Sequence, residues 1–209
     1  PMAESEGVIR YQLDYLPGNL PQELDLSGLL LWFGRCHALG LIGQDPERYD
    51  GFAYGNISIR ADLGFVISGT QTGGNPGLSP RDLAWVQDFD PAQNRLKATG
   101  PARPSSEAMT HGQIYRASPA ANAVIHAHSG LIWRQARRLG LALTSPEVGY
   151  GTPEMAAEVE RLLALESVDF GAFAMGGHED GVVVYAADME TAGRLMLDLL
   201  SRASAISVS

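Results

Sequence analysis

The segment from residue 104 to residue 129 constrains the fold of this chain more than any other stretch. Residues 106–117 have the mixed apolar and polar spacing of a helix, and Ser118-Pro119 ends it because a residue before proline is disfavoured in the helical region. Residues 122–128 alternate and are rich in small and β-branched side chains, which is typical of a strand. The sequence therefore predicts a helix followed at once by a strand.

The two histidines of this strand return to the start of the helix. The helix is about 16 Å long and the strand about 23 Å, and the turn between them is so short that they run antiparallel. Side chains two apart on a strand share a face, so His126 and His128 can bind one divalent metal ion. Alternatively they are two polar residues on a solvated face, but the apolar lead-in at 123–125 favours the metal. Glu107 would then lie near the ion.

The residues at the helix start allow several roles. Ser105 and Ser106 fit plain N-capping. Glu107 does not belong to a capping box, since no acid stands three residues after either serine. It can complement the helix dipole, pair with His111 four residues on, or take part in chemistry. The free N–H groups and the two hydroxyls also make this helix start a ready anion site.

Pro104-Ser105-Ser106-Glu107 followed by His126-Ala127-His128 resembles the motif of the class II aldolase and adducin-head superfamily, and the resemblance covers about residues 29–200. The superfamily includes fuculose-1-phosphate aldolase, ribulose-phosphate 4-epimerases and methylthioribulose-phosphate dehydratase. The resemblance implies a three-layer α/β/α sandwich with a central mixed, largely antiparallel sheet, and a homotetramer with its site near a subunit interface. The order of helices, hairpins and strands also predicts an α/β fold and argues against a Rossmann order.

The resemblance also implies a third metal ligand and a phosphate site. The ligand is His178, in the glycine-rich loop 176–181, where Glu179 or Asp180 could complete or replace it. Taken alone, a histidine in such a loop is more often a turn residue, and Gly55-Asn56 alone is typical of a turn. The stretch 68–77 leaves open which of two pairs, Ser68-Gly69 or Thr72-Gly73, contacts the phosphate. The implied phosphate-binding residues are Gly55, Asn56, Ser68, Gly69, Thr72, Gly73, Ser105 and Ser106.

The chain departs from the family's aldolases where proton-donating tyrosines are expected. The segment between His128 and Gly151 is shorter than in those aldolases, and Tyr150 is a candidate by residue type only. The tyrosine in the C-terminal tail of fuculose-phosphate aldolase has no counterpart, since no tyrosine follows Tyr185. These departures weaken the expectation of aldol cleavage. They make epimerisation and dehydration, which need the same metal and carboxylate, serious alternatives.

The net charge, the one lysine and the single cysteine limit the possible partners and reaction mechanisms of this chain. Fifteen Lys and Arg against 24 Asp and Glu give a net charge of −9, which argues against nucleic acid or an acidic membrane as the main partner. A Schiff-base mechanism needs a lysine nucleophile, and the one lysine, Lys97, lies in a turn-like stretch, so metal is the expected route to carbonyl chemistry. The single cysteine, Cys36, lies in an apolar run that predicts a buried thiol, and it excludes an internal disulfide.

The chain has the size and composition of one domain, with 209 residues of which 45% are hydrophobic. We expect an irregular N-terminal arm over residues 1–26, a single domain over 27–202 and a C-terminal tail over 203–209. Residues 1–6 lack a signal-peptide pattern and no apolar run reaches the length of a membrane span, so we expect a cytoplasmic protein. Further helices are predicted at 28–39, 131–138, 153–165 and 188–200, and strands at 55–60, 64–68, 84–89, 170–175 and 182–186.

Together these features predict a metal-dependent lyase. Three histidines, His126, His128 and His178, would hold Zn²⁺ or another divalent transition metal with one position open. The ion would polarise the carbonyl of a small phosphorylated sugar or hydroxy-carbonyl compound and stabilise an enediolate in a retro-aldol cleavage, while Glu107 carries the proton. The alternatives are epimerase or dehydratase chemistry on the same site, or a non-catalytic binding module like the adducin head. The three histidines and Glu107 argue against the module.

Overall fold

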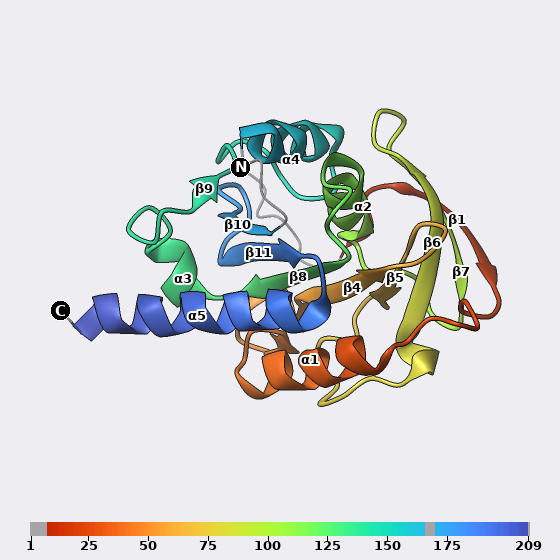
Figure 1. Cartoon of the computed structure of the whole chain (residues 1–209), viewed down its shortest axis with the longest axis horizontal. Coiled ribbons are helices and arrows are strands. Elements are labelled where there is room, and N and C mark those ends of the chain that lie inside the picture. Colours follow the sequence, from red (N-terminus) through yellow and green to blue (C-terminus); the bar gives the residue numbers. More distant parts are fainter. Residues whose placement is uncertain (1–7, 166–169, 209) are drawn as a thin grey trace.

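The backbone forms three layers (Figure 1). The computed structural model describes residues 8–165 and 170–208. On one side of a central sheet, α1 (Ser27–Ala38) and α3 (Gly130–Arg134) pack against α5 (Met189–Val208). On the other side, α2 (Ala108–Ala117) packs against α4 (Pro153–Leu165). The predicted α/β/α sandwich is therefore confirmed.

Within the described residues, the central sheet has nine strands in the order β1-β7-β6-β5-β4-β8-β11-β10-β9. Among these described strands, only the two outermost pairs, β1 with β7 and β9 with β10, are parallel, which makes the sheet mixed and largely antiparallel. A separate ribbon joins β2 to β3. The strands are β1 (Gln12–Pro17), β2 (Gly43–Gln44), β3 (Ala53–Tyr54), β4 (Asn56–Arg60), β5 (Phe65–Ser68), β6 (Leu83–Asp90), β7 (Arg95–Gly100), β8 (Ala123–His128), β9 (Ala142–Leu143), β10 (Gly171–Ala174) and β11 (Gly181–Ala186), with short 3-10 turns at Tyr49–Gly51 and Pro80–Asp82.

Each face of the sheet has its own apolar core, and β8 contributes to both. Its Ile125 and Ala127 lie in the core under α1 and α5, whereas Val124 lies in the core under α2 and α4. Side chains alternate along a strand, so His126 and His128 lie on the same face as Val124. The fold therefore turns both histidines towards α2.

The central unit and several other elements match the predictions. α2 begins two residues after the predicted start and is followed at once by β8, while β4 and β5 form the predicted hairpin. α4 has the predicted bounds, and the Thr152 hydroxyl caps it by accepting from the Met155 N–H at 3.2 Å. Cys36 is buried as predicted, and burial raises the pKa of its thiol to about 12.

Four predictions of local structure need correction. The arm over residues 1–26 is not wholly irregular, because β1 pairs with β7 at the sheet edge. The stretch around Lys97 forms β7, with Leu96 and Ala98 buried, and is not a turn. The predicted tail over 203–209 is wrong for its described part, since α5 continues to Val208. The helix predicted at 131–138 is the shorter α3. Residues 1–7, 166–169 and 209, including the segment considered as a signal peptide, lie outside the described residues.

Among the residues that the structure describes, none of the helices combines the length and apolarity that crossing a bilayer requires.

Candidate functional site

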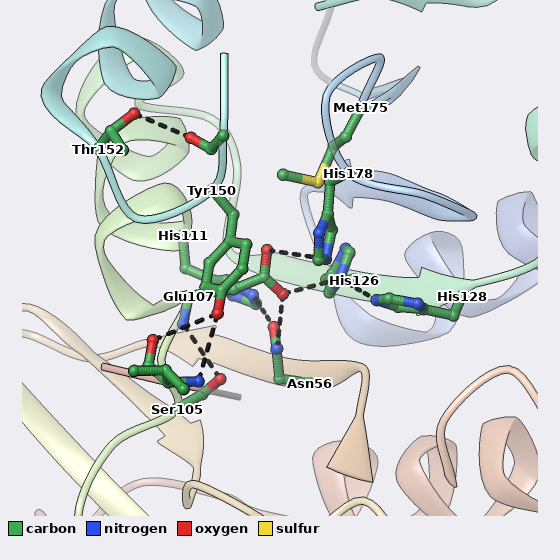
Figure 2. A network of polar contacts seen from close by, with 12 residues as sticks. Asn56, Ser105, Glu107, His111, His126, His128, Tyr150, Thr152, Met175 and His178 are labelled. Carbon is green, nitrogen blue, oxygen red and sulfur yellow. Dashed lines mark hydrogen bonds and ion pairs between the residues drawn. The ribbon is translucent and has the colours of Figure 1, made fainter. Parts of the chain in front are cut away.

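Three buried histidines converge at the C-terminal end of β8 (Figure 2). His126 and His128 lie on β8, and their Nε2 atoms are 3.1 Å apart. His178 comes from the turn between β10 and β11, and one nitrogen from each ring lies within 4.8 Å of the others. Each side chain is at most 3% exposed. The structure thus brings together the three histidines that the sequence singled out as ligands.

Strand pairing and a tight turn explain how His178 reaches the other two. β11 runs antiparallel to β8 with Gly181 opposite His128, so the turn that precedes β11 lies beside the histidines. A side chain at Gly177 would overlap the Val148 carbonyl, so only glycine fits at this position. The His178 N–H donates to the Met175 carbonyl at 3.2 Å and closes the turn.

Glu107 lies against the histidines as predicted from the antiparallel helix and strand. Its Oε2 is 2.7 Å from Nε2 of His126, and its Oε1 is 3.8 Å from Nε2 of His178. The Asn56 amide, from β4, donates to Oε2 at 3.0 Å. Glu107 is 1% exposed and stands at the N-cap position of α2, where its side chain makes no capping bond. Its carboxylate is therefore directed at the cluster and not at the helix end.

Burial and close contacts set the protonation states. Burial lowers the pKa of His128 well below its usual value and that of His178 to about 4, so both rings are neutral near pH 7. Burial opposes the charge on Glu107, but attraction to His126 and its hydrogen bond, then His178 and the Asn56 amide, lower the pKa of Glu107 to about 2. The site thus offers the neutral imidazoles of His128 and His178 beside a carboxylate.

These donors fit a divalent ion. In a tetrahedral zinc site with Zn–N bonds of about 2.0–2.1 Å, ligand nitrogens lie about 3.4 Å apart. The 3.1 Å between His126 and His128 is close to that value, and His178 needs only a small shift from within 4.8 Å. Glu107 Oε1 has no hydrogen-bond partner among the described residues. Imidazole and carboxylate suit Zn²⁺ and its first-row neighbours.

A small hollow next to Asn56 gathers most of the residues predicted to bind phosphate. Ser68 is the exception, because its hydroxyl is buried and accepts from the Ile57 N–H at 3.1 Å. The hollow has a volume of about 10 Å³, the space of about one water molecule, so a larger anion requires this loop to open. Its predicted members are Gly55, Asn56, Gly69, Thr72, Gly73, Ser105 and Ser106.

Both glycine pairs left open by the sequence thus contribute to one hollow. Gly69 and Gly73 line it together, and Thr72 closes the loop between them by donating to the Gly69 carbonyl at 2.7 Å. A cavity of about 680 Å³ lies elsewhere, between residues 19–24 and the β4–β5 hairpin. It contains none of the predicted site residues.

The side chains of Glu179 and Asp180, which follow His178, point away from the histidine cluster. Glu179 is exposed. The Asp180 carboxylate accepts hydrogen bonds from the Tyr49 hydroxyl at 2.6 Å and from Arg48 at 3.2 Å. The Tyr49 ring in turn packs edge-on against His128, with centroids 4.7 Å apart. No pattern in the sequence indicated this contact, because Arg48 and Tyr49 lie in a polar loop.

Tyr150 lies beside the cluster. Its ring centroid is 4.8 Å from that of His178, and the residue is fully buried. Its hydroxyl lies 3.3 Å from both the N–H and the carbonyl of Val8. Figure 2 shows the ring next to Glu107. The tyrosine considered by residue type alone is therefore adjacent to the candidate metal ligands.

His111 does not pair with the Glu107 side chain, which corrects one of the roles considered for that acid. Its Nε2 lies 2.6 Å from Oδ1 of Asn56 and its Nδ1 lies 2.7 Å from the Ser58 hydroxyl. Asn56 bridges His111 and Glu107 (Figure 2). The i,i+4 spacing indicated proximity, but the bridging residue comes from another strand and has no local sequence signal.

Comparison with known proteins gave one family. The model of the class II aldolase and adducin N-terminal domain matches residues 45–205. No curated protein matches the chain.

Several solved structures share the fold. L-fuculose-1-phosphate aldolase from Thermus thermophilus has a TM-score of 0.66 at 22% identity, covering 87% of this chain and 92% of that one. YgbL from Escherichia coli has a TM-score of 0.64 at 20% identity, with 86% of each chain covered. An aldolase II superfamily protein from Pseudomonas syringae has a TM-score of 0.52 at 18% identity, covering 89% and 76%. At these identities the likeness is one of fold.

Proposed function

Because the chain belongs to the class II aldolase and adducin family, we propose that it is a metal-dependent lyase. Its substrate would be a small phosphorylated sugar or hydroxy-carbonyl compound, cleaved in a retro-aldol reaction. One observation carries this proposal: three buried imidazoles and one buried carboxylate meet at a single point. A scaffold without chemistry has no use for four polar groups in its core, since burying them costs free energy.

The proposed ligands are His126, His128 and His178, and the proposed ion is Zn²⁺. An ion held there would act as a Lewis acid on the substrate carbonyl. The chain supplies the geometry for this role. Two ligands are fixed by one strand and the third by a turn that glycine alone permits. A rigid ligand set of this kind leaves a coordination position for substrate.

Glu107 is proposed to move the proton. Its low pKa keeps it as a carboxylate near neutral pH, the form that accepts a proton. Oε2 is held by the Asn56 amide, and Oε1 makes no hydrogen bond within the described chain. Oε1 is therefore the atom proposed to take the proton from substrate.

The phosphate is proposed to bind in the hollow beside Asn56. Backbone N–H groups of glycine-rich turns and a helix start favour anions without needing a lysine. Gly69, Gly73 and Ser106 line this hollow, and Asn56 joins it to Glu107. A phosphate there would hold the reacting carbons near the histidines. The family resemblance supports a homotetramer as the working assembly.

A screen of sugar phosphates tests the proposal. Protein loaded with Zn²⁺ would be assayed with and without chelator, and products identified by NMR. Two carbonyl fragments would establish aldol cleavage; a stereoisomer or loss of water would instead establish epimerisation or dehydration, which the altered tyrosine pattern keeps as second candidates. Metal uptake below about half an equivalent per chain, even after added metal, would favour a binding module and contradict the proposal.

A further inference from the structure

A continuous chain of four hydrogen bonds runs from Glu107 into the core under α2. Asn56 Nδ2 lies 3.0 Å from Glu107 Oε2, and Asn56 Oδ1 lies 2.6 Å from His111 Nε2. His111 Nδ1 lies 2.7 Å from the Ser58 hydroxyl, which lies 2.7 Å from the Tyr115 hydroxyl. All five side chains are buried, none above 4% exposed.

The chemistry of the groups fixes the direction of every bond. An ionised carboxylate only accepts, so the Asn56 amide nitrogen faces Glu107 and its oxygen faces His111. That oxygen also only accepts, so His111 carries its proton on Nε2. Nδ1 is then an acceptor and Ser58 donates to it. The Ser58 oxygen is left to accept from Tyr115, and all four donors point towards Glu107.

The protonation states of the inner residues agree with this order. Burial lowers the pKa of His111 to about 3, which keeps the ring neutral with one N–H. Burial raises the pKa of Tyr115, so its hydroxyl keeps the proton that it donates. Arg60 stacks over the Tyr115 ring at 4.8 Å and holds the Ala121 carbonyl, which fixes the far end of the chain.

We propose that His111 is a positioning residue for Glu107, acting through Asn56. Its Nε2–H tautomer, held by Ser58, locks the Asn56 amide so that Nδ2 faces Glu107 Oε2. That bond holds Oε2 and leaves Oε1 directed at the histidine cluster, 3.8 Å from His178. The consequence for turnover rests on the proposed function of Glu107. The tautomer and the amide orientation do not.

The tautomer is tested directly by NMR of metal-free protein labelled with ¹⁵N-histidine. His111 is assigned as the signal lost in His111→Gln. The expected result near pH 7 is a ring protonated on Nε2 alone. A ring protonated on Nδ1, or on both nitrogens, would reverse or break the chain and overturn the proposal. The measurement needs no substrate and no metal.

Two variants separate positioning from mere packing. Glutamine places an N–H donor near the position of Nε2, whereas leucine fills similar space without one. We expect His111→Leu to keep bound metal and substrate KM but to lose about 10- to 100-fold in kcat, the cost of a misplaced catalytic group. His111→Gln should recover most of that loss. Equal kcat in the two variants would overturn the proposal.

A third measurement still tests the proposal if His111→Leu does not fold or if no substrate is turned over. Exchange of the Asn56 side-chain amide protons with solvent should be slow in the native protein and should stay slow in His111→Gln, whose N–H can still hold Asn56 Oδ1. If the tautomer and the slow exchange are found but no sugar phosphate reacts, the proposed function fails and the positioning of Glu107 stands. Fast amide exchange in the native protein would refute the positioning.

Discussion

Glu107 and His126 meet at 2.7 Å, although one begins α2 and the other lies within β8. The carboxylate therefore touches the same Nε2 atom that the proposed ion needs. Both side chains are 1% exposed, so solvent does not weaken the contact. A cation at the cluster and a proton on Glu107 oppose each other electrostatically, which keeps the carboxylate ionised when the ion is present.

Replacing Glu107 by glutamine is expected to separate metal binding from turnover. The amide keeps the size of the carboxylate but cannot take a proton, so kcat should fall by about 10²- to 10⁴-fold. The three histidines are untouched, and metal content should stay near that of the native protein. Elemental analysis and initial rates measure the two effects. Glu160→Gln, on the exposed face of α4, is the matched control; full activity of Glu107→Gln would remove this residue from the mechanism.

Removing the His178 ring is expected to abolish tight metal binding. The two histidines of β8 alone give an incomplete ligand set, and a lost ligand typically costs at least the 10- to 100-fold that outer partners cost. His37→Ala is the control, because His37 lies on α1 and is not part of the cluster. Metal affinity is measured by competition with a chromophoric chelator. Equal affinity in the two variants would contradict the proposed ligand set.

His111 should make the metal-free protein less stable in acid. Its pKa is about 3 in the folded protein and about 6.5 unfolded. Between these values the unfolded chain binds a proton that the folded chain does not, so this residue lowers the free energy of unfolding by about 1.4 kcal/mol for each unit by which the pH decreases. Urea unfolding of native protein and His111→Gln at several pH values measures the slope. An unchanged slope in the variant would show that burial does not depress this pKa.

The loop of the proposed phosphate site depends on a glycine that has no room for a side chain. A Cβ at Gly73 would lie 2.7 Å from the carbonyl oxygens of Gly43 and Tyr54, whereas one at Gly77 meets nothing. Gly73→Ala should therefore displace the loop and raise KM for a phosphorylated substrate with a smaller effect on kcat. Gly77→Ala should behave as the native protein. If both variants kept the native KM, the phosphate would have to bind elsewhere.

The local part of the site could be predicted from the sequence and the non-local part could not. Periodicity alone placed His126 and His128 on one face and near Glu107, because a helix and a strand joined by a short turn leave few arrangements. His178 was found only through the family resemblance. Asn56 was predicted for phosphate, but its bond to Glu107 depends on strand pairing of β4 with β8, which no local pattern encodes.

The fold predictions failed at the edge strand β1 and at its neighbour β7. Polar and apolar residues alternate along β1, and Leu13 and Tyr15 pack against the core. The prolines in and after this stretch indicated an irregular arm instead. β7 alternates in the same way, although the stretch around Lys97 is typical of a turn in sequence alone. The extension of α5 had a signal as well: Leu199, Ala203 and Ile206 continue one apolar face.

Packing between α1 and α5 depends on Gly193, which gives the last prediction. A Cβ at this position would overlap the Trp32 ring, which is 2% exposed and cannot swing into solvent. Gly193→Ala should therefore cost about 1–3 kcal/mol of unfolding free energy, even though alanine favours a helix by about 1 kcal/mol. Gly34→Ala on α1, whose nearest atom is 3.7 Å away, is the control and should be neutral or stabilising. Thermal unfolding compares the two, and a Gly193→Ala protein as stable as Gly34→Ala would show that the helices are not in close contact here.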